Sequence, residues 1–132
     1  MKVIVFDTET TGLLPSRFPR NSSTVEKFPH IVQLSYIVYD TETHKIVHEQ
    51  DDIIRLPAEV DIPEETSAIH GITKQLSKNR GIHIDSALEI FSLYVKQCQC
   101  VVAHNIDFDM TMIDVECIRT GIKDPFTSEK IY

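Results

Sequence analysis

The sequence predicts an α/β domain with a mixed β-sheet, in which three antiparallel strands and one parallel strand are flanked by helices. Residues 2–7, KVIVFD, are mostly apolar and β-branched, which is typical of a buried strand. The strand patterns at 30–40 and 44–56 are joined by a short polar link, so we expect them to be antiparallel neighbours. A short apolar run at 99–105 is expected to lie parallel to the first strand.

The helices are predicted in the second half of the chain. They cover residues 63–71, 73–79, 85–98 and 106–121. Gly71 and Gly121 stand where helices commonly end, because glycine adopts the left-handed conformation of a C-terminal cap without steric cost. In the third helix, apolar residues recur at three- and four-residue spacing. Ser86 and Glu89 have the spacing of a capping box there, and Asp85 is an alternative cap.

A long loop is predicted between the first two strands. Residues 14–29 contain three prolines, three serines and an asparagine, and a strand or helix does not tolerate that composition. Loops of this length in compact domains often carry function. The whole chain of 132 residues fits one domain, residues 1–132.

The composition limits the classes of function. With 20 acidic and 13 basic residues, the net charge of −7 argues against a protein that holds nucleic acid through a broad basic face. It allows a nucleic-acid enzyme in which acidic residues bind divalent cations. No apolar run approaches the roughly 18 residues that span a membrane, and no signal peptide is recognisable, so we expect a cytoplasmic protein with no membrane partner. Cys98 and Cys100 are half of a metal site or two thiols at a helix-to-strand junction.

Two carboxylates follow the first strand. Side chains two residues apart in a strand face the same side, so Asp7 and Glu9 face together if the strand geometry persists to Glu9. Adjacent carboxylates repel each other unless a cation lies between them, and a hard divalent cation such as Mg²⁺ or Mn²⁺ suits oxygen ligands. The alternative interpretation is a solvated acidic turn after a strand.

A third carboxylate follows the second buried strand. Asp109 lies early in the helix that begins there, and Asp107 is expected on the other side of that helix. Either residue is also explained as a first-turn acid that the helix dipole favours. If the two buried strands are parallel neighbours, their ends bring Asp7, Glu9 and Asp109 around one point, where sites are common in sheets that carry helices.

Three segments resemble the motifs of a known enzyme family. The stretch VFDTETTGL is similar to the first motif of the DEDD superfamily of proofreading-type exonucleases, and VVAHNIDFDMTMI is similar to the second. SAIHGIT resembles the segment that these enzymes carry between the two motifs. The order matches, and the resemblance covers essentially the whole chain, with the DnaQ-like (DEDDh) branch, which includes the epsilon proofreading subunit of bacterial DNA polymerase III, as the most similar.

The resemblance implies a ribonuclease-H-like fold and a metal-dependent 3′–5′ exonuclease that releases nucleoside monophosphates from a single-stranded or frayed 3′ end of DNA or RNA. It implies that Asp7 ligates two Mg²⁺ or Mn²⁺ ions, Glu9 one, and Asp109 the second, directly or through water. A DNA polymerase subunit is a possible partner. The residues implied to line the substrate are Thr10, Thr11, Gly12, Leu13, Ile69, His70, Asn105 and Phe108. For His70 a helix-end role, and for Phe108 core packing, are the alternatives.

One part of the family pattern is missing. The third motif, His-x-x-x-x-Asp on a C-terminal helix, does not occur after Asp109. His104 has the right spacing to Asp109 but lies inside the second motif, and we expect it to pack or form hydrogen bonds at the strand end. We therefore expect a C-terminally incomplete domain with weak or no activity. The alternatives are a non-catalytic nucleic-acid-binding or polymerase-associated module, another metal phosphohydrolase, and a ribonuclease-H-type endonuclease.

Overall fold

The predicted mixed sheet is confirmed in a computed structural model, which describes residues 1–15 and 18–132. The strands are β1 (Lys2–Thr10), β2 (Ile31–Asp40), β3 (Lys45–Ile53) and β4 (Cys100–Val102). Their order in the sheet is β3-β2-β1-β4. The β1–β2 and β2–β3 pairs are antiparallel, whereas β4 runs parallel to β1, along Val3–Val5. Because β1 and β3 are both antiparallel to β2, they run in the same direction, and their last residues lie at the same end of the sheet.

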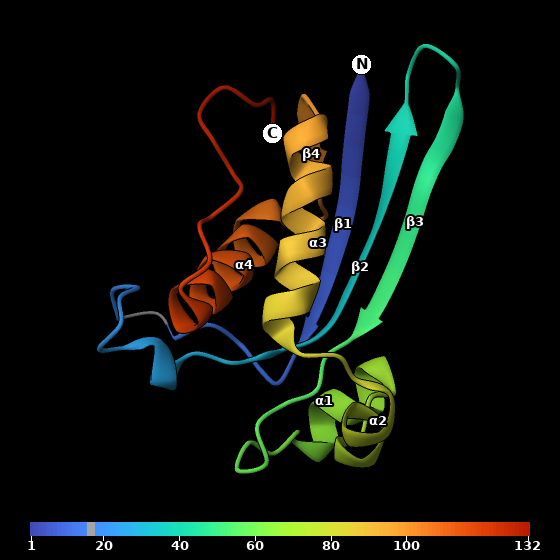
Figure 1. Cartoon of the computed structure of the whole chain (residues 1–132). Helices are drawn as coiled ribbons and strands as arrows, with labels where there is room; N and C mark the ends of the chain where they lie inside the picture. The colour runs from blue at the N-terminus through green and yellow to red at the C-terminus, as the bar shows by residue number, and fades with distance from the viewer. Residues whose placement is uncertain (16–17) are drawn as a thin grey trace.

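The helices cover one face of this sheet and one end of its strands. They are α1 (Glu64–His70), α2 (Lys74–Arg80), α3 (Ile84–Gln97) and α4 (Ile106–Thr120), with a 3-10 turn η1 (Val25–Lys27). Figure 1 shows α3 and α4 against one face, and α1 and α2 beyond the ends of β1 and β3. No helix in the described part of the chain combines the length and the apolar character needed to cross a membrane.

The core lies between the sheet and the two longer helices. Along β1, Ile4, Phe6 and Thr8 are buried, while the alternating residues Val5 and Asp7 are exposed on the opposite face. The apolar stripe of α3 packs against the buried face. The central members of this core are Ile4, Phe6, Leu34, Tyr36, Val38, Leu88, Phe91, Val95, Met112 and Ile113. The sheet therefore has one face that the helices cover and one open face, and Asp7 lies on the open face.

The ends of the helices follow the sequence in part. Gly71 and Gly121 take the left-handed conformation with φ of 76° and 75°, and they cap α1 and α4 as expected. The capping box at Ser86 is wrong, because α3 begins at Ile84, two residues earlier. Asp85 already lies in the first turn, where its carboxylate accepts a hydrogen bond of 2.8 Å from the Ser86 amide.

The loop before β2 is held to α4 by a buried ion pair. Glu116 is 1% exposed, and its carboxylate accepts hydrogen bonds from the Ile31 amide at 3.1 Å and from Arg119 at 2.8 Å. Arg119 also donates to the backbone oxygens of Val25, Phe28 and Pro29 at 2.6, 2.6 and 2.8 Å. The guanidinium thus replaces the backbone partners that an irregular segment lacks.

The rest of the predicted loop at 14–29 is described except at two positions. Ser16 and Arg17 lie outside the described residues. Residues 14 and 15 show no regular secondary structure, and a 3-10 turn, η1, interrupts the later part. Most of the predicted loop is therefore confirmed, with one short helical turn that the composition did not indicate.

Candidate active site

Asp7 and Glu9 lie on one face of the same strand. β1 continues to Thr10, so the extended geometry persists as far as the second carboxylate, as the prediction required. Asp7 pairs in register with Ser35 and Glu9 with Gln33, and these residues share the open face. Burial raises the pKa of Glu9, the negative charge of Asp7 raises it further, and the charge of His70 opposes both. Asp7, Glu9 and His70 are therefore electrostatic neighbours.

Asp109 is held at the edge of β1 by Thr8. Its Oδ1 accepts a hydrogen bond of 2.5 Å from the Thr8 hydroxyl and one of 3.3 Å from the Thr8 amide. The carboxylate is 3% exposed. Burial raises the pKa of Asp109, and the charges of Asp7 and Glu9 add to that shift, while the Thr8 bonds oppose it. The third predicted carboxylate thus lies within the electric field of the other two.

The three carboxylates are not gathered as they would be around a bound ion. Among residues 1–15 and 18–132, no group of three or more histidine, cysteine, aspartate or glutamate side chains has the arrangement of a metal site. Asp7 and Glu9 face the open side of β1, whereas Asp109 bonds to Thr8, which alternates with them. The prediction that all three share cations stays a prediction.

The segment after Glu9 forms a short turn that is tied to the loop before β2. The Thr10 hydroxyl donates to the Gly12 oxygen at 2.7 Å. Thr11 and His30 exchange two bonds, from the Thr11 amide to the His30 oxygen at 2.9 Å and from the His30 amide to the Thr11 hydroxyl at 3.0 Å. Leu13 follows with its side chain 88% exposed. Thr11 is thereby fixed to the loop that Arg119 holds.

The end of α1 places a second exposed apolar side chain near the carboxylates. Ile69 is 81% exposed, which is unusual for isoleucine in a folded domain. In the next residue, His70, Nδ1 accepts a hydrogen bond of 3.0 Å from the Ile72 amide, so a neutral ring carries its proton on Nε2. Among the described residues Nε2 is buried and has no hydrogen-bond partner. His70 thus has a helix-end role and a free donor as well.

The turn between β4 and α4 depends on Asn105. This residue has φ of 54° and ψ of 58°, a left-handed conformation that asparagine tolerates better than most residues. Phe108 is half-buried and packs against the core, in line with its alternative interpretation. Asp107 is exposed and Asp109 buried, which confirms that the helix points them to different sides. His104 is exposed, so it does not pack at the strand end; the alternative expectation, that it forms hydrogen bonds there, stays a prediction.

Sequence reasoning missed three residues that build this region. Thr8 was not singled out, although its hydroxyl and amide both bind Asp109. Glu116 and Arg119 were not singled out either, because their spacing of three on a helix looks like an ordinary surface ion pair. The sequence offers an indirect signal for Arg119, because the backbone oxygens of an irregular buried loop need a side chain that donates several hydrogen bonds.

Comparison with known families identifies the class of protein. The family model described as exonuclease, RNase_T, matches residues 4–131. The chain therefore belongs to this exonuclease family, of the DEDD type, and has its ribonuclease-H-like fold. None of the curated protein sequences matches the chain.

Solved structures show the same fold at low sequence identity. Exonuclease I from Methylocaldum szegediense aligns with a TM-score of 0.73 and 21% identity, over 99% of this chain and 27% of that one. Escherichia coli exonuclease I in complex with a dT13 oligonucleotide gives 0.72 and 16%, over 98% and 26%. Exonuclease X in complex with 5′-overhanging duplex DNA gives 0.58 and 23%, over 83% and 52%. The chain thus spans about a quarter of the exonuclease I chains.

Proposed function

We propose that this chain carries the acidic centre of a metal-dependent 3′–5′ exonuclease that hydrolyses phosphodiester bonds at nucleic-acid 3′ ends and releases nucleoside monophosphates. One observation carries the proposal: Asp7 and Glu9 share one face of β1, within the field of the buried Asp109, in a chain of the exonuclease family. Like charges so close together cost free energy that a bound cation offsets.

The donor set fits Mg²⁺ or Mn²⁺. Carboxylate oxygens are the ligands that these hard cations prefer, and Asp7, Glu9 and Asp109 supply only such oxygens. Both Thr8 bonds go to Oδ1 of Asp109, so within the described residues Oδ2 is left for a cation or for a water that the cation holds. Asp7, Glu9 and Asp109 would hold these cations, which would supply stabilisation of negative charge on the phosphate and activation of a water.

The flanking residues suit a terminal nucleotide. Leu13, four residues after Glu9, and Ile69, at the end of α1, both project into solvent, and exposed apolar side chains can pack against an unpaired base. A Cβ on Gly12 would meet no atom within 4 Å, so the backbone there has open space for a ligand. His70 Nε2 is buried and has no partner among the described residues, so we assign His70 to the support of this site and not to a direct contact with the nucleotide. We assign Thr10, Thr11, Asn105 and Phe108 to the wall and support of the same site.

The absence of a third motif bears on activity. No histidine occurs after Asp109, so these 132 residues do not supply the general base that the family uses. We expect slow turnover from the chain alone. The same observation favours a second candidate, a nucleic-acid-binding module that keeps the fold without catalysis. An epsilon-like proofreading role with a polymerase partner is the narrower form of the first proposal, and it rests on the resemblance of the motifs.

Metal binding is the first test, because it does not depend on turnover. Mn²⁺ titration followed by electron paramagnetic resonance should show binding that Asp7→Asn weakens at least tenfold. Asp51→Asn is the matched control, since Asp51 pairs in register with Ser35 on the same open face. Affinity should fall as the pH drops through the raised pKa of Glu9, because the ligands must be deprotonated. Equal Mn²⁺ affinity in the wild type and in Asp7→Asn would refute the metal site.

Strand shortening is the second test. A 5′-labelled oligonucleotide, made once as DNA and once as RNA, should shorten from its 3′ end one nucleotide at a time with Mn²⁺ present. Asp7→Asn should abolish the ladder, and Gly12→Ala should weaken it without loss of folding, since the added methyl group meets only open space. Internal cuts would indicate an endonuclease. Mn²⁺ and strand binding without any shortening would establish the second candidate.

A further inference from the structure

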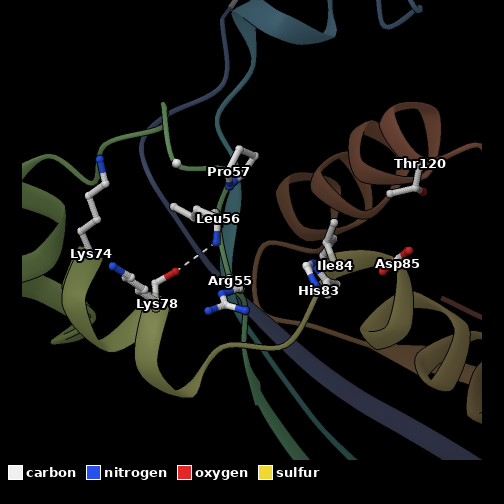
Figure 2. Close-up of a pocket in the computed structure, with 11 residues that line it drawn as sticks. Arg55, Leu56, Pro57, Lys74, Lys78, His83, Ile84, Asp85 and Thr120 are labelled. Atoms are coloured by element: carbon white, nitrogen blue, oxygen red, sulfur yellow. Dashed lines mark hydrogen bonds between the residues drawn. The ribbon is translucent and has the colours of Figure 1, made fainter.

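A pocket of about 850 Å³ lies at the end of β3. Figure 2 shows Lys74 and Lys78 on one side of it, His83, Ile84, Asp85 and Thr120 on the other, and Arg55 to Pro57 between them. The floor is rigid, because the Arg55 amide donates to the Ile82 oxygen at 2.7 Å and the Ser77 hydroxyl donates to the Ile54 oxygen at 2.7 Å.

The pocket concentrates positive charge in an acidic chain. Arg55, Lys74, Lys78 and His83 line it, and Asp85 is the one acidic residue among its lining residues. The chain as a whole has a net charge of −7. Lys74 forms an exposed ion pair with Asp61 at 2.7 Å, which neutralises part of its charge. Within residues 1–15 and 18–132, neither Arg55 nor Lys78 takes part in an ion pair, so both are available to an anion.

The strand register places this pocket close to the acidic centre. Glu9 pairs with Gln33, and Gln33 pairs with Ile53, so these residues lie on three adjacent strands. At about 4.8 Å between strands, Ile53 is roughly 10 Å from Glu9, and Arg55 follows two residues later, at roughly 12 Å. The pocket is also lined by the start of α3 and the end of α4, which cover the face opposite to Asp7 and Glu9. A strand that reaches both sites therefore passes around the end of the sheet, over a path longer than this straight distance, and needs several nucleotides to do so.

We infer that this pocket binds backbone phosphates of the substrate strand several nucleotides from its 3′ end, an assignment that rests on the proposed function. Arg55 and Lys78 neutralise the phosphates, and the apolar side chains of Leu56 and Ile84 contact sugar and base. The remaining surface is acidic overall, so the pocket supplies the attraction that a strand needs there. An acidic protein segment is the competing occupant, and the experiment below separates the two.

The test measures binding of a fluorescent 12-nucleotide oligo-dT by anisotropy, with EDTA present so that no cleavage occurs. Arg55→Glu with Lys78→Glu should weaken binding at least tenfold relative to the control, Lys45→Glu with Lys96→Glu. The control has the same charge change at exposed positions near the opposite ends of β3 and α3. Loss of two phosphate contacts should also lower the slope of log affinity against log salt by about 1.4. Melting temperatures show whether each variant folds.

A length series and a competitor complete the design. A two-nucleotide oligo-dT does not reach the pocket, so the Arg55 and Lys78 substitutions should leave its binding unchanged. If the charge-reversal variant does not fold, Arg55→Gln with Lys78→Gln takes its place with the same expectation, at a smaller effect. Equal binding of the 12-mer by the pocket variant and the control overturns the inference. The inference is also overturned if labelled hexaglutamate binds the wild type, loses its binding in the pocket variant, and is displaced by unlabelled hexaglutamate but not by the 12-mer.

Failure of this inference differs from failure of the proposed function. If Asp7→Asn abolishes Mn²⁺ binding and strand shortening while the pocket variant binds the 12-mer normally, the exonuclease proposal stands and the pocket assignment falls. If Asp7→Asn has no effect on metal or cleavage but the pocket variant loses the 12-mer, the pocket is a strand-binding site in a protein with a different activity.

Discussion

The buried ion pair between Glu116 and Arg119 should determine both the stability of the domain and the position of the Thr10–Leu13 turn. Glu116 satisfies the amide of Ile31, and Arg119 satisfies three backbone oxygens of the preceding loop. That loop ends at His30, which exchanges two hydrogen bonds with Thr11. Loss of the pair should therefore release the loop and, through it, one wall of the candidate site.

The expected cost follows from what each change leaves unpaired. Glu116→Ala strands the buried Ile31 amide and a guanidinium whose side chain is only 14% exposed. An unsatisfied buried amide costs about 1–3 kcal/mol, and removal of one partner of a buried ion pair costs about 3–5 kcal/mol in total. Glu116→Gln keeps one of the two acceptors and should cost less, and Arg119→Lys, which cannot reach three oxygens at once, should cost an intermediate amount.

Urea unfolding followed by circular dichroism measures these differences. Glu89→Gln is the control, because Glu89 is an exposed acid on α3 and should change the free energy of unfolding by less than about 0.5 kcal/mol. Hydrogen exchange at the amides of residues 25–31 reports the release of the loop directly. A free energy of unfolding for Glu116→Ala within about 1 kcal/mol of the wild type would refute this account of the loop.

Three further changes have defined outcomes. Thr8→Val removes a hydrogen bond to a carboxylate and should destabilise the protein by about 1.5–3 kcal/mol, with a rise in the pKa of Asp109 that a carbon-detected titration can follow. Burial and the charge of Arg119 lower the pKa of His30 from 6.5 to about 4, so stability should be lost as the pH falls from 6.5 to 4. The free energy of unfolding of His30→Gln should therefore fall less steeply over this pH range than that of the wild type. Parallel slopes of the free energy of unfolding against pH would contradict this. Gly81→Ala places a methyl group 2.2 Å from a backbone oxygen, whereas the methyl group of Gly12→Ala has no atom within 4 Å. Gly81→Ala should therefore have the lower melting temperature, and equal melting temperatures would disprove the clash.

Local regularities explain what the sequence predicted well. The alternation of side chains along a strand placed Asp7 and Glu9 on one face, and the structure keeps that face as far as Thr10. Glycines at the ends of α1 and α4 marked those ends because few other residues adopt φ near 75° at no cost. These inferences needed only the residues within one element.

Contacts between distant segments explain what the sequence did not predict. The capping box predicted at Ser86 is a local pattern, and it is wrong because α3 already begins at Ile84, which packs against the core. The basic pocket joins Arg55, at the end of β3, to Lys78 on α2, and no spacing in the chain relates them. Such sites depend on topology, which single-sequence patterns do not determine.

The length of β4 accounts for the position of Asp109. β4 ends at Val102, which pairs with Val5, so within residues 1–15 and 18–132 β1 has no partner strand on that side when it reaches Thr8. The Thr8 amide would then be an unpaired donor in a buried place. After β4, the left-handed conformation of Asn105 turns the chain and starts α4 at the next residue, and the first turn of that helix brings Asp109 to the free amide. A longer β4 would pair with Thr8 instead, and the acidic centre would lose its third carboxylate.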